Sequence, residues 1–471
     1  MKILLACGLL PFLLVSCSTP QLGPWHTVSL GSEFTAKQER ELKSLDDYLK
    51  LEDVLFEELA SKINGAVSTG DEFSKTRFSD GSLSDPLVRQ PNWNRTFELK
   101  PETVRGGVLM LHGLSDSPYS MRSLAQMLVS HGYHVVGLRL PGHGTAPSGL
   151  NALHWKDAAA AVRVALRHLG ATVGGSPVHI YGYSFGAPLA INAALDAMEQ
   201  DDLPNPDSIV LLSPAIGVVG AARFAGTANA VFSIPGLRAR RWIRVVPEYD
   251  PYKYNSFNLN AGSQVYKLTK HVAKRIEKRR KQNPENVLPP TLVVSSTVDS
   301  TVSTQAIIDR LLAMLSSGKH ELVLFDINRV AAKSEFLVSN PAPFTASTMA
   351  RSDLPFTLSL VTNTGPASVE VEVRRKLPQT TGFADVTPLN LSWPDGVFSL
   401  SHFALPIPTD DPLYGQTKPE NKDDLYLGNR EFLGETGMLV MPARWLMRLR
   451  YNPFYSYVEE RTLNWLAANS E

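Results

Sequence analysis

The chain has 471 residues, of which 43% are apolar, so it can bury a large hydrophobic core and could form more than one folded unit. Its 46 Lys and Arg residues balance its 46 Asp and Glu residues, which excludes a global electrostatic attraction to nucleic acid or to an anionic surface. Nucleic acid is therefore not an expected partner, and function has to be sought in local motifs.

The first residues have the layout of an export signal. Lys2 precedes an apolar run that is too short for a comfortable transmembrane helix. The run ends in Leu14-Val15-Ser16-Cys17, which resembles the bacterial lipobox, whose cysteine is lipidated and becomes the first mature residue. Residues 1–16 are thus predicted to be a lipoprotein signal peptide and Cys17 a lipidation site. The alternative is a simple signal peptide cut near Ser18.

This reading predicts a lipid-anchored protein of the bacterial cell envelope. Ser18, where a signal for retention in the inner membrane would have Asp, favours the outer membrane. Cys7 and Cys17 are the only cysteines of the chain, so cleavage before Cys17 would leave no disulfide, cysteine metal site or catalytic thiol.

Residues 17–94 are predicted to form a tether and an N-terminal helix. Within them, leucines recur among charged residues from Ala36 to Ile63 with a helical spacing that gives one apolar face. This helix is expected to pack on the main body of the protein, and a partner-binding helix is the alternative.

From Arg95 onward, apolar strand patterns alternate with helical patterns, which indicates an α/β fold with a mostly parallel sheet flanked by helices. Helices are predicted at about 119–131, 154–169 and 455–468, and a further helix follows the third strand. The predicted buried strands are Gly107–His112, Val135–Leu140, Val178–Tyr181, Ser208–Ser213, Thr291–Ser296 and Glu321–Phe325.

Two long segments interrupt this alternation and divide the core into residues 95–214, 291–327 and 395–471. Residues 215–290 have helical and aromatic content of their own and are predicted to form a lid over the strand ends. Residues 328–394 contain two alternating apolar runs around Asn363-Thr364-Gly365-Pro366, which predicts a β-hairpin.

A candidate nucleophile lies where the third strand turns into an alanine-rich helix, in Gly182-Tyr183-Ser184-Phe185-Gly186. A serine between two glycines at a strand-to-helix turn is typical of the nucleophile elbow of hydrolases. The turn strains the serine backbone, and side chains two residues away on either side would clash with the strand and helix. Ser184 is therefore the predicted nucleophile.

A serine nucleophile needs a base to take its proton and a carboxylate to orient that base. In this type of site the order along the chain is Ser, then Asp or Glu, then His, each after a strand. Asp299 follows the 291–296 strand and is the preferred acid, with Asp326 as its rival. His320 opens a strand at the wrong edge of the sheet, which leaves His402 as the predicted base.

Acyl transfer also needs donors for the developing oxyanion. The backbone N–H of Phe185, directly after the nucleophile, is one predicted donor. The N–H of Leu114, in the loop after the first buried strand, is the other. The side chain of His112 is expected to support this loop rather than to contact a substrate.

These motifs, together with Arg139-Leu140-Pro141-Gly142-His143-Gly144, resemble the α/β-hydrolase superfamily, and within it monoacylglycerol-lipase-like and serine aminopeptidase S33-type hydrolases. The resemblance implies a triad of Ser184, Asp299 and His402, an acyl-enzyme intermediate, and neither metal nor cofactor. The 328–394 insertion departs from that family, in which the histidine comes soon after the last strand.

The expected activity is hydrolysis of carboxylic esters of hydrophobic or fatty acyl groups, on small-molecule ester or lipid substrates. A thioesterase or peptidase with the same triad is an alternative, because these activities differ in the leaving group and not in the motifs. A non-catalytic envelope lipoprotein that keeps the scaffold for binding is the alternative from another class.

One stretch of the predicted lid is strongly basic. Residues 267–281 hold eight Lys and Arg residues against Glu277, with apolar residues along one helical face. A basic amphipathic helix can lie on an anionic lipid surface or steer an anionic substrate, and a solvated helix face is the more common meaning of such a run.

Overall fold

The computed structural model describes residues 21–42, 44–67, 75–217, 228, 232, 238–299, 301–331, 341–421, 424–428 and 449–470. The predicted signal peptide and the predicted lipidation site at Cys17 lie outside these residues. Within the described ranges, no helix combines the length and the apolar character that crossing a membrane would require.

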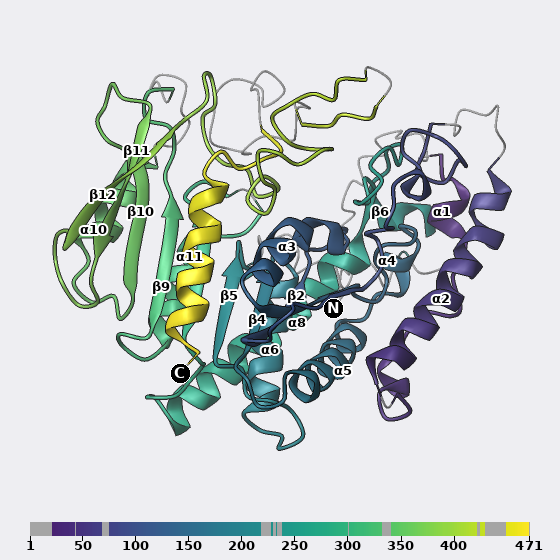
Figure 1. The fold of residues 1–471 in the computed structure, drawn as a ribbon, viewed down its shortest axis with the longest axis horizontal. Helices are drawn as coiled ribbons and strands as arrows, with labels where there is room; N and C mark the ends of the chain where they lie inside the picture. The colour runs from purple at the N-terminus through teal and green to yellow at the C-terminus, as the bar shows by residue number, and fades with distance from the viewer. Residues whose placement is uncertain are drawn as a thin grey trace, which may run out of the picture.

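A ten-stranded sheet organises the chain, with the strand order β1-β3-β2-β4-β5-β8-β9-β10-β11-β12 (Figure 1). Neighbouring strands are parallel from β3 to β10, and the pairs β1/β3, β10/β11 and β11/β12 are antiparallel. The strands are β1 (Phe97–Leu99), β2 (Gly106–Leu111), β3 (Tyr133–Leu138), β4 (Val178–Tyr183), β5 (Ser208–Leu212), β8 (Thr291–Ser296), β9 (His320–Phe325), β10 (Thr357–Asn363), β11 (Glu370–Lys376) and β12 (Asp385–Ser392).

The six strands predicted from the sequence correspond to β2, β3, β4, β5, β8 and β9, each within two residues of its predicted bounds. All six are buried along their whole length, because both faces of the sheet are covered. In β2, Leu109 and Leu111 face one core. Val108 and Met110 face the other core, as the two-residue period of a strand requires.

Helices cover the two faces unequally. Helices α5, α6, α8 and α9 contribute to one core, whereas α3 and α11 contribute to the other, and Figure 1 shows α11 lying along the sheet. The helices of the main body are α3 (Arg122–Ser130), α4 (Gly149–Ala152), α5 (Trp155–Val173), α6 (Gly186–Ala197), α8 (Leu259–Gln282), α9 (Thr304–Arg310), α10 (Ala342–Ala350) and α11 (Tyr455–Ala468).

The N-terminal segment differs from the single helix predicted for residues 36–63. A short α1 (Pro24–Thr27) and a 3₁₀ turn (Ala36–Gln38) precede α2 (Leu45–Lys62). Helix α2 begins at Leu45 because the Ser44 side chain accepts a hydrogen bond from the N–H of Asp47 at 3.3 Å and so caps the helix. The hydroxyl of Tyr48 donates to the carbonyl of Arg139 at 2.7 Å, which attaches α2 to the body as predicted.

The segment predicted to be a lid, residues 215–290, contains a two-stranded sheet of β6 (Trp242–Arg244) and β7 (Phe257–Asn258), followed by α8. The apolar residues predicted to share one face of α8 are buried, and the helix packs against α6 on the side of the sheet. Only the first turns of α8 reach the cavity at the strand ends. The described residues of this segment that border the cavity thus belong to the β6–β7 region and to the start of α8, and its role as a lid stays a prediction.

The 328–394 insertion contains the predicted hairpin, formed by β10 and β11. Strand β10 also pairs in parallel with β9, so the hairpin extends the main sheet, and β12 adds an edge strand that the sequence did not predict. Both ends of the insertion meet at Asn328. Its N–H donates to the carbonyl of Phe398 at 2.8 Å, and its side-chain amide donates to the carbonyl of Val397 at 2.9 Å.

Candidate active site

Ser184 lies at the carboxyl end of β4, where the chain turns into α6. Its φ of 52° is in the left-handed region that residues other than glycine rarely adopt. A Cβ on Gly182 would lie 2.6 Å from the carbonyl oxygen of Gly186, and a Cβ on Gly186 would collide with the carbonyl of Leu111. The two glycines are therefore what lets the strained turn form between a strand and a helix.

The three residues predicted to form the triad lie in one hydrogen-bonded chain. Nε2 of His402 is 2.9 Å from Oγ of Ser184, and Nδ1 of His402 is 2.7 Å from Oδ2 of Asp299. The side chain of His402 is 4% exposed and that of Asp299 is fully buried, so the bond between these two residues is shielded from bulk water.

The carboxylate of Asp299 is held from several sides. Its Oδ1 accepts the N–H groups of Thr301 at 2.8 Å and Val302 at 3.0 Å, which leaves Oδ2 for His402. Burial alone would raise the pKa of Asp299, but the charge of His402 and the hydrogen bonds from His402, Val302 and Thr301 outweigh it, so the pKa lies below its usual value. Asp299 is therefore suited to remain charged beside an imidazolium.

The loop that carries His402 is attached to the elbow itself. The hydroxyl of Tyr183, the residue before Ser184, donates to the carbonyl of His402 at 3.2 Å. The two rings also pack with their centroids 5.4 Å apart. Tyr183 was not singled out in the sequence, because an aromatic residue in the elbow is equally consistent with ordinary core packing.

The rival residues lie elsewhere. Oδ2 of Asp326 accepts hydrogen bonds from Arg329 and from Thr362, each at 2.8 Å, and serves the junction with the insertion. His320 is buried at the start of β9, at the opposite end of the strand, where burial lowers its pKa to about 4. Neither side chain approaches Ser184.

The predicted oxyanion donors, the N–H groups of Leu114 and Phe185, border the same cavity as Ser184. Among the described residues, no oxygen accepts a hydrogen bond from either N–H group, so both are available to a ligand. His112 has the supporting position expected of it. Its Nδ1 is 2.9 Å from the carbonyl of Gly113, and its Nε2 accepts the N–H of Leu140 at 3.1 Å.

A cavity of about 590 Å³ opens over Ser184 and His402, which is within the usual size range of small-molecule sites. Its walls come from the loop after β2, from the β6–β7 region, from the start of α8 and from the loop of His402. They are largely apolar, and their main apolar members are Leu114, Phe185, Ala215, Ile243, Phe257, Leu259, Val265, Val302 and Phe403.

One ion pair stands out in this apolar cavity. Nζ of Lys253 lies 3.2 Å from Oδ1 of Asp116 and 4.3 Å from the ring centroid of Phe403. The next residue, Tyr254, donates its N–H to the carbonyl of Ser115 at 2.7 Å, so the 250s segment holds the oxyanion loop in two places. Sequence reasoning missed Lys253, because a lone lysine in a long insertion carries no signal.

Residues 108–326 match the model of the alpha/beta hydrolase family. A comparison with curated proteins found no match.

Several solved structures are similar to this chain. One, reported for the metagenome-derived lipolytic enzymes LipS and LipT, is 22% identical, with 49% of this chain and 87% of that chain covered and a TM-score of 0.40. A monoacylglycerol lipase of Paleococcus ferrophilus is 18% identical, with 49% and 89% covered and a TM-score of 0.37. A soluble variant of the monoglyceride lipase of Saccharomyces cerevisiae is 14% identical, with 49% and 82% covered and a TM-score of 0.38.

The family match begins in β2 and ends just after β9, and so spans the parallel strands from β2 to β9 with the elbow among them. The predicted fold class is confirmed: this chain has the α/β-hydrolase fold, with residues 108–326 matching the alpha/beta hydrolase family.

Proposed function

We propose that this protein is a serine hydrolase that cleaves carboxylic esters of hydrophobic or fatty acyl groups. The observation that carries the proposal is the chain of hydrogen bonds from Ser184 through His402 to Asp299 at the floor of a largely apolar cavity. An apolar cavity accommodates an acyl chain, and a serine activated by a buried histidine supplies the nucleophile.

In the proposed reaction, Oγ of Ser184 bonds to the acyl carbon while its proton passes to Nε2 of His402. The carbonyl oxygen becomes an oxyanion. This oxyanion accepts hydrogen bonds from the backbone N–H groups of Leu114 and Phe185. The imidazolium, stabilised by Asp299, then donates its proton to the departing alkoxide, which leaves an acyl-enzyme. In the second half of the reaction, water attacks the acyl carbon of the acyl-enzyme while His402 takes its proton. His402 then returns the proton to Oγ of Ser184, and the carboxylic acid is released.

The test uses Ser184→Ala and a matched control, Ser213→Ala. Ser213 is also a buried serine with positive φ, at the end of the neighbouring strand β5, and it does not line the cavity. Ser184→Ala should abolish turnover of p-nitrophenyl esters and labelling by a fluorophosphonate, and Ser213→Ala should retain both. Turnover by a folded Ser184→Ala variant would refute the proposal.

The leaving group is examined with a panel of esters, thioesters and aminoacyl amides that share one acyl chain. We expect the highest kcat/KM for the esters. Preferential turnover of the thioesters or the amides would instead favour the thioesterase or peptidase alternative, and no turnover of any member would favour a non-catalytic scaffold.

We also propose that Cys17 carries a lipid that anchors the protein in the bacterial envelope, in the outer membrane. The support is the sequence Leu14-Val15-Ser16-Cys17 after an apolar run. Cys17→Ser should prevent incorporation of labelled palmitate. Undiminished palmitate labelling of the Cys17→Ser variant would show that this assignment is wrong.

A further inference from the structure

Helix α8 divides its basic residues between two roles. Each of its three arginines in the 267–281 stretch has a hydrogen-bond partner in the protein, and those of Arg275 and Arg280 lie on other segments of the body. Their partners are Asp196 and Glu199 for Arg275, the carbonyl of Asn286 for Arg279, and the sulfur of Met314 for Arg280.

The lysines of the same stretch form the opposite, exposed side of the helix. We call Lys267, Lys270, Lys274, Lys278 and Lys281 the lysine face. Among the described residues, Lys281 has an acidic partner, the exposed Glu277 at 2.8 Å, and the other four have none. Because successive lysines are three or four positions apart, they lie along one side of α8, away from its buried apolar residues.

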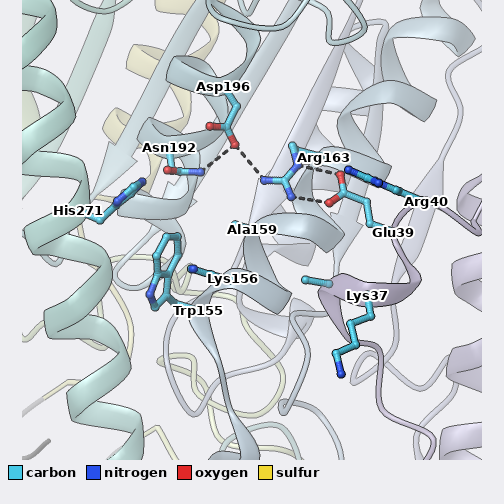
Figure 2. Close-up of a pocket in the computed structure, with 11 residues that line it drawn as sticks. Lys37, Glu39, Arg40, Trp155, Lys156, Ala159, Arg163, Asn192, Asp196 and His271 are labelled. Carbon is cyan, nitrogen blue, oxygen red and sulfur yellow. Dashed lines mark hydrogen bonds and ion pairs between the residues drawn. The ribbon is translucent and has the colours of Figure 1, made fainter.

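A second cavity of about 590 Å³, separate from the one at Ser184, is lined on one side by His271 of α8 (Figure 2), the residue that follows Lys270 of the lysine face. It lies between α8, the start of α5 and the segment around residues 36–40. His271 of α8 points toward Trp155, with ring centroids 4.8 Å apart, and Glu39 and Arg40 lie on the other side. The exposed side chains of Lys37, Arg40 and Lys156 add three cations to its rim.

The acidic residues of this cavity do not neutralise the positive charge of Lys37, Arg40 and Lys156 at its rim. Glu39 is bound by Arg163, with a second contact from Arg167 at 3.1 Å. Asp196 is bound by Arg163 at 3.1 Å and by Arg275, as the dashed lines around Arg163 in Figure 2 partly show. Both carboxylates are thus occupied by arginines of the protein, and the positive charge of the lysines remains available to a ligand.

We propose that the lysine face, together with Lys37, Arg40 and Lys156, docks on an anionic phospholipid bilayer. Since the whole chain has a formal net charge of zero, this concentration of cations is a local feature and not a consequence of a basic protein. Lysines close to an anionic lipid surface each add to binding, and a half-buried Trp155 beside them suits the membrane interface.

A lipid surface fits these observations better than a nucleic acid does. Recognition of nucleic-acid phosphates makes use of the planar, bidentate guanidinium group. Each arginine of the 267–281 stretch has a hydrogen-bond partner in the protein, whereas four of the five lysines of the lysine face have no acidic partner among the described residues and act as hydrated point charges. The inference rests in part on the proposed function, because hydrophobic esters partition into bilayers and docking would bring the enzyme to them.

The test measures binding of the full chain, carrying Cys17→Ser and Ser184→Ala, to vesicles of equal parts phosphatidylglycerol and phosphatidylcholine. These two changes remove any lipid on residue 17 and any turnover. The docking variant is Lys267→Gln/Lys274→Gln/Lys278→Gln. The control, Lys75→Gln/Lys319→Gln/Lys418→Gln, removes the same charge from exposed lysines on other elements.

We expect the docking variant to lose about a hundred-fold in partition coefficient, the control variant to bind like its parent, and added salt to weaken binding. Equal binding by the two variants, equal binding to pure phosphatidylcholine, or binding to heparin without binding to vesicles would overturn the proposal. Because turnover of soluble esters is measured separately in chains that retain Ser184, failure of the esterase assignment is distinguishable from failure of docking.

Discussion

The N–H of Asn328 donates to the carbonyl of Phe398 at 2.8 Å, which joins the two ends of an insertion of nearly seventy residues. Asn328 follows β9, and Phe398 precedes the loop that carries His402. The hairpin and β12 are therefore an excursion that leaves and re-enters the core at one place. This closure explains how a histidine so far along the chain reaches Ser184.

Asn328→Ala should loosen the His402 loop. The side chain of Asn328 is 2% exposed, and its loss leaves the carbonyl of Val397 without its donor, a cost of about 1–3 kcal/mol in the free energy of unfolding. We expect kcat to fall more than KM rises, because the nucleophile and the base are displaced and the cavity is not. Steady-state kinetics and urea denaturation test this. Thr387→Ala, on the exposed β12, is the control. Equal kcat values for the two variants would contradict the prediction that Asn328 positions the His402 loop.

Asp299→Asn should lower kcat by about 10³ to 10⁴-fold, because an amide does not stabilise the imidazolium and favours the wrong tautomer of His402. Asp326→Asn, which alters the rival carboxylate, should lower kcat far less, because it affects the junction with the insertion and does not contact His402. Comparable losses in the two variants would argue against the assignment of Asp299.

The pKa of Asp299 also predicts the pH dependence. Since its folded-state pKa lies below the usual value, protonation of Asp299 should not add a second ionisation to the acid limb of log kcat/KM above about pH 4, so that limb should have a slope of one. Its contribution to stability is present above the unfolded-state pKa of about 3.9 and is lost as the pH falls through the folded-state pKa. The stabilities of Asp299→Asn and of the unmodified protein should accordingly converge in acid. A difference between them that stays constant down to pH 2 would count against this account.

Lys253→Met should destabilise the protein by about 3 kcal/mol, because it leaves the carboxylate of Asp116 without its cation in an apolar cavity. Replacing both partners, in Asp116→Asn/Lys253→Met, should recover much of that loss. Denaturation of the two single variants and the double variant forms a double-mutant cycle, and strictly additive effects would show that the pair does not interact.

Gly186→Ala should cost about 3 kcal/mol or more, since the added Cβ collides with the carbonyl of Leu111 in the tightest part of the elbow. Gly365→Ala is a matched control, because no atom lies within 4 Å of the Cβ it would add and its φ is not in the left-handed region. Thermal denaturation of both variants measures the difference, and similar melting temperatures would mean that the elbow has room to relax.

The parts of the fold that the sequence predicted well are those governed by local periodicity and by chain order. Buried parallel strands are continuous apolar runs, so β2, β3, β4, β5, β8 and β9 were predicted within two residues of their bounds. Chain order restricted the base to His320 or His402, and only His402 lies at the carboxyl end of the sheet. The role of Gly182 and Gly186 could be predicted because one steric cause, the close contact of strand and helix at the elbow, excludes a side chain at both positions.

Other features depend on contacts between distant segments and carry no local signal. Lys253 and Asp116 are separated by 137 positions, and neither belongs to a motif. The capping of α2 by Ser44 split a helix that periodicity alone had continued through residues 36–63. Strand β12 is exposed along most of its length, and its apolar alternation is limited to Leu389 and Leu391, which is too short to predict a strand.

The same exposure has a consequence for solubility. In the part of the chain that the structure describes, β12 is the last strand of the sheet, and an unpaired edge can template the addition of a strand from another chain, which leads to aggregation. Pro388 interrupts the row of backbone donors in β12, and the acidic Asp385 begins the strand. The insertion that extends the sheet therefore also ends it with an edge that resists polymerisation.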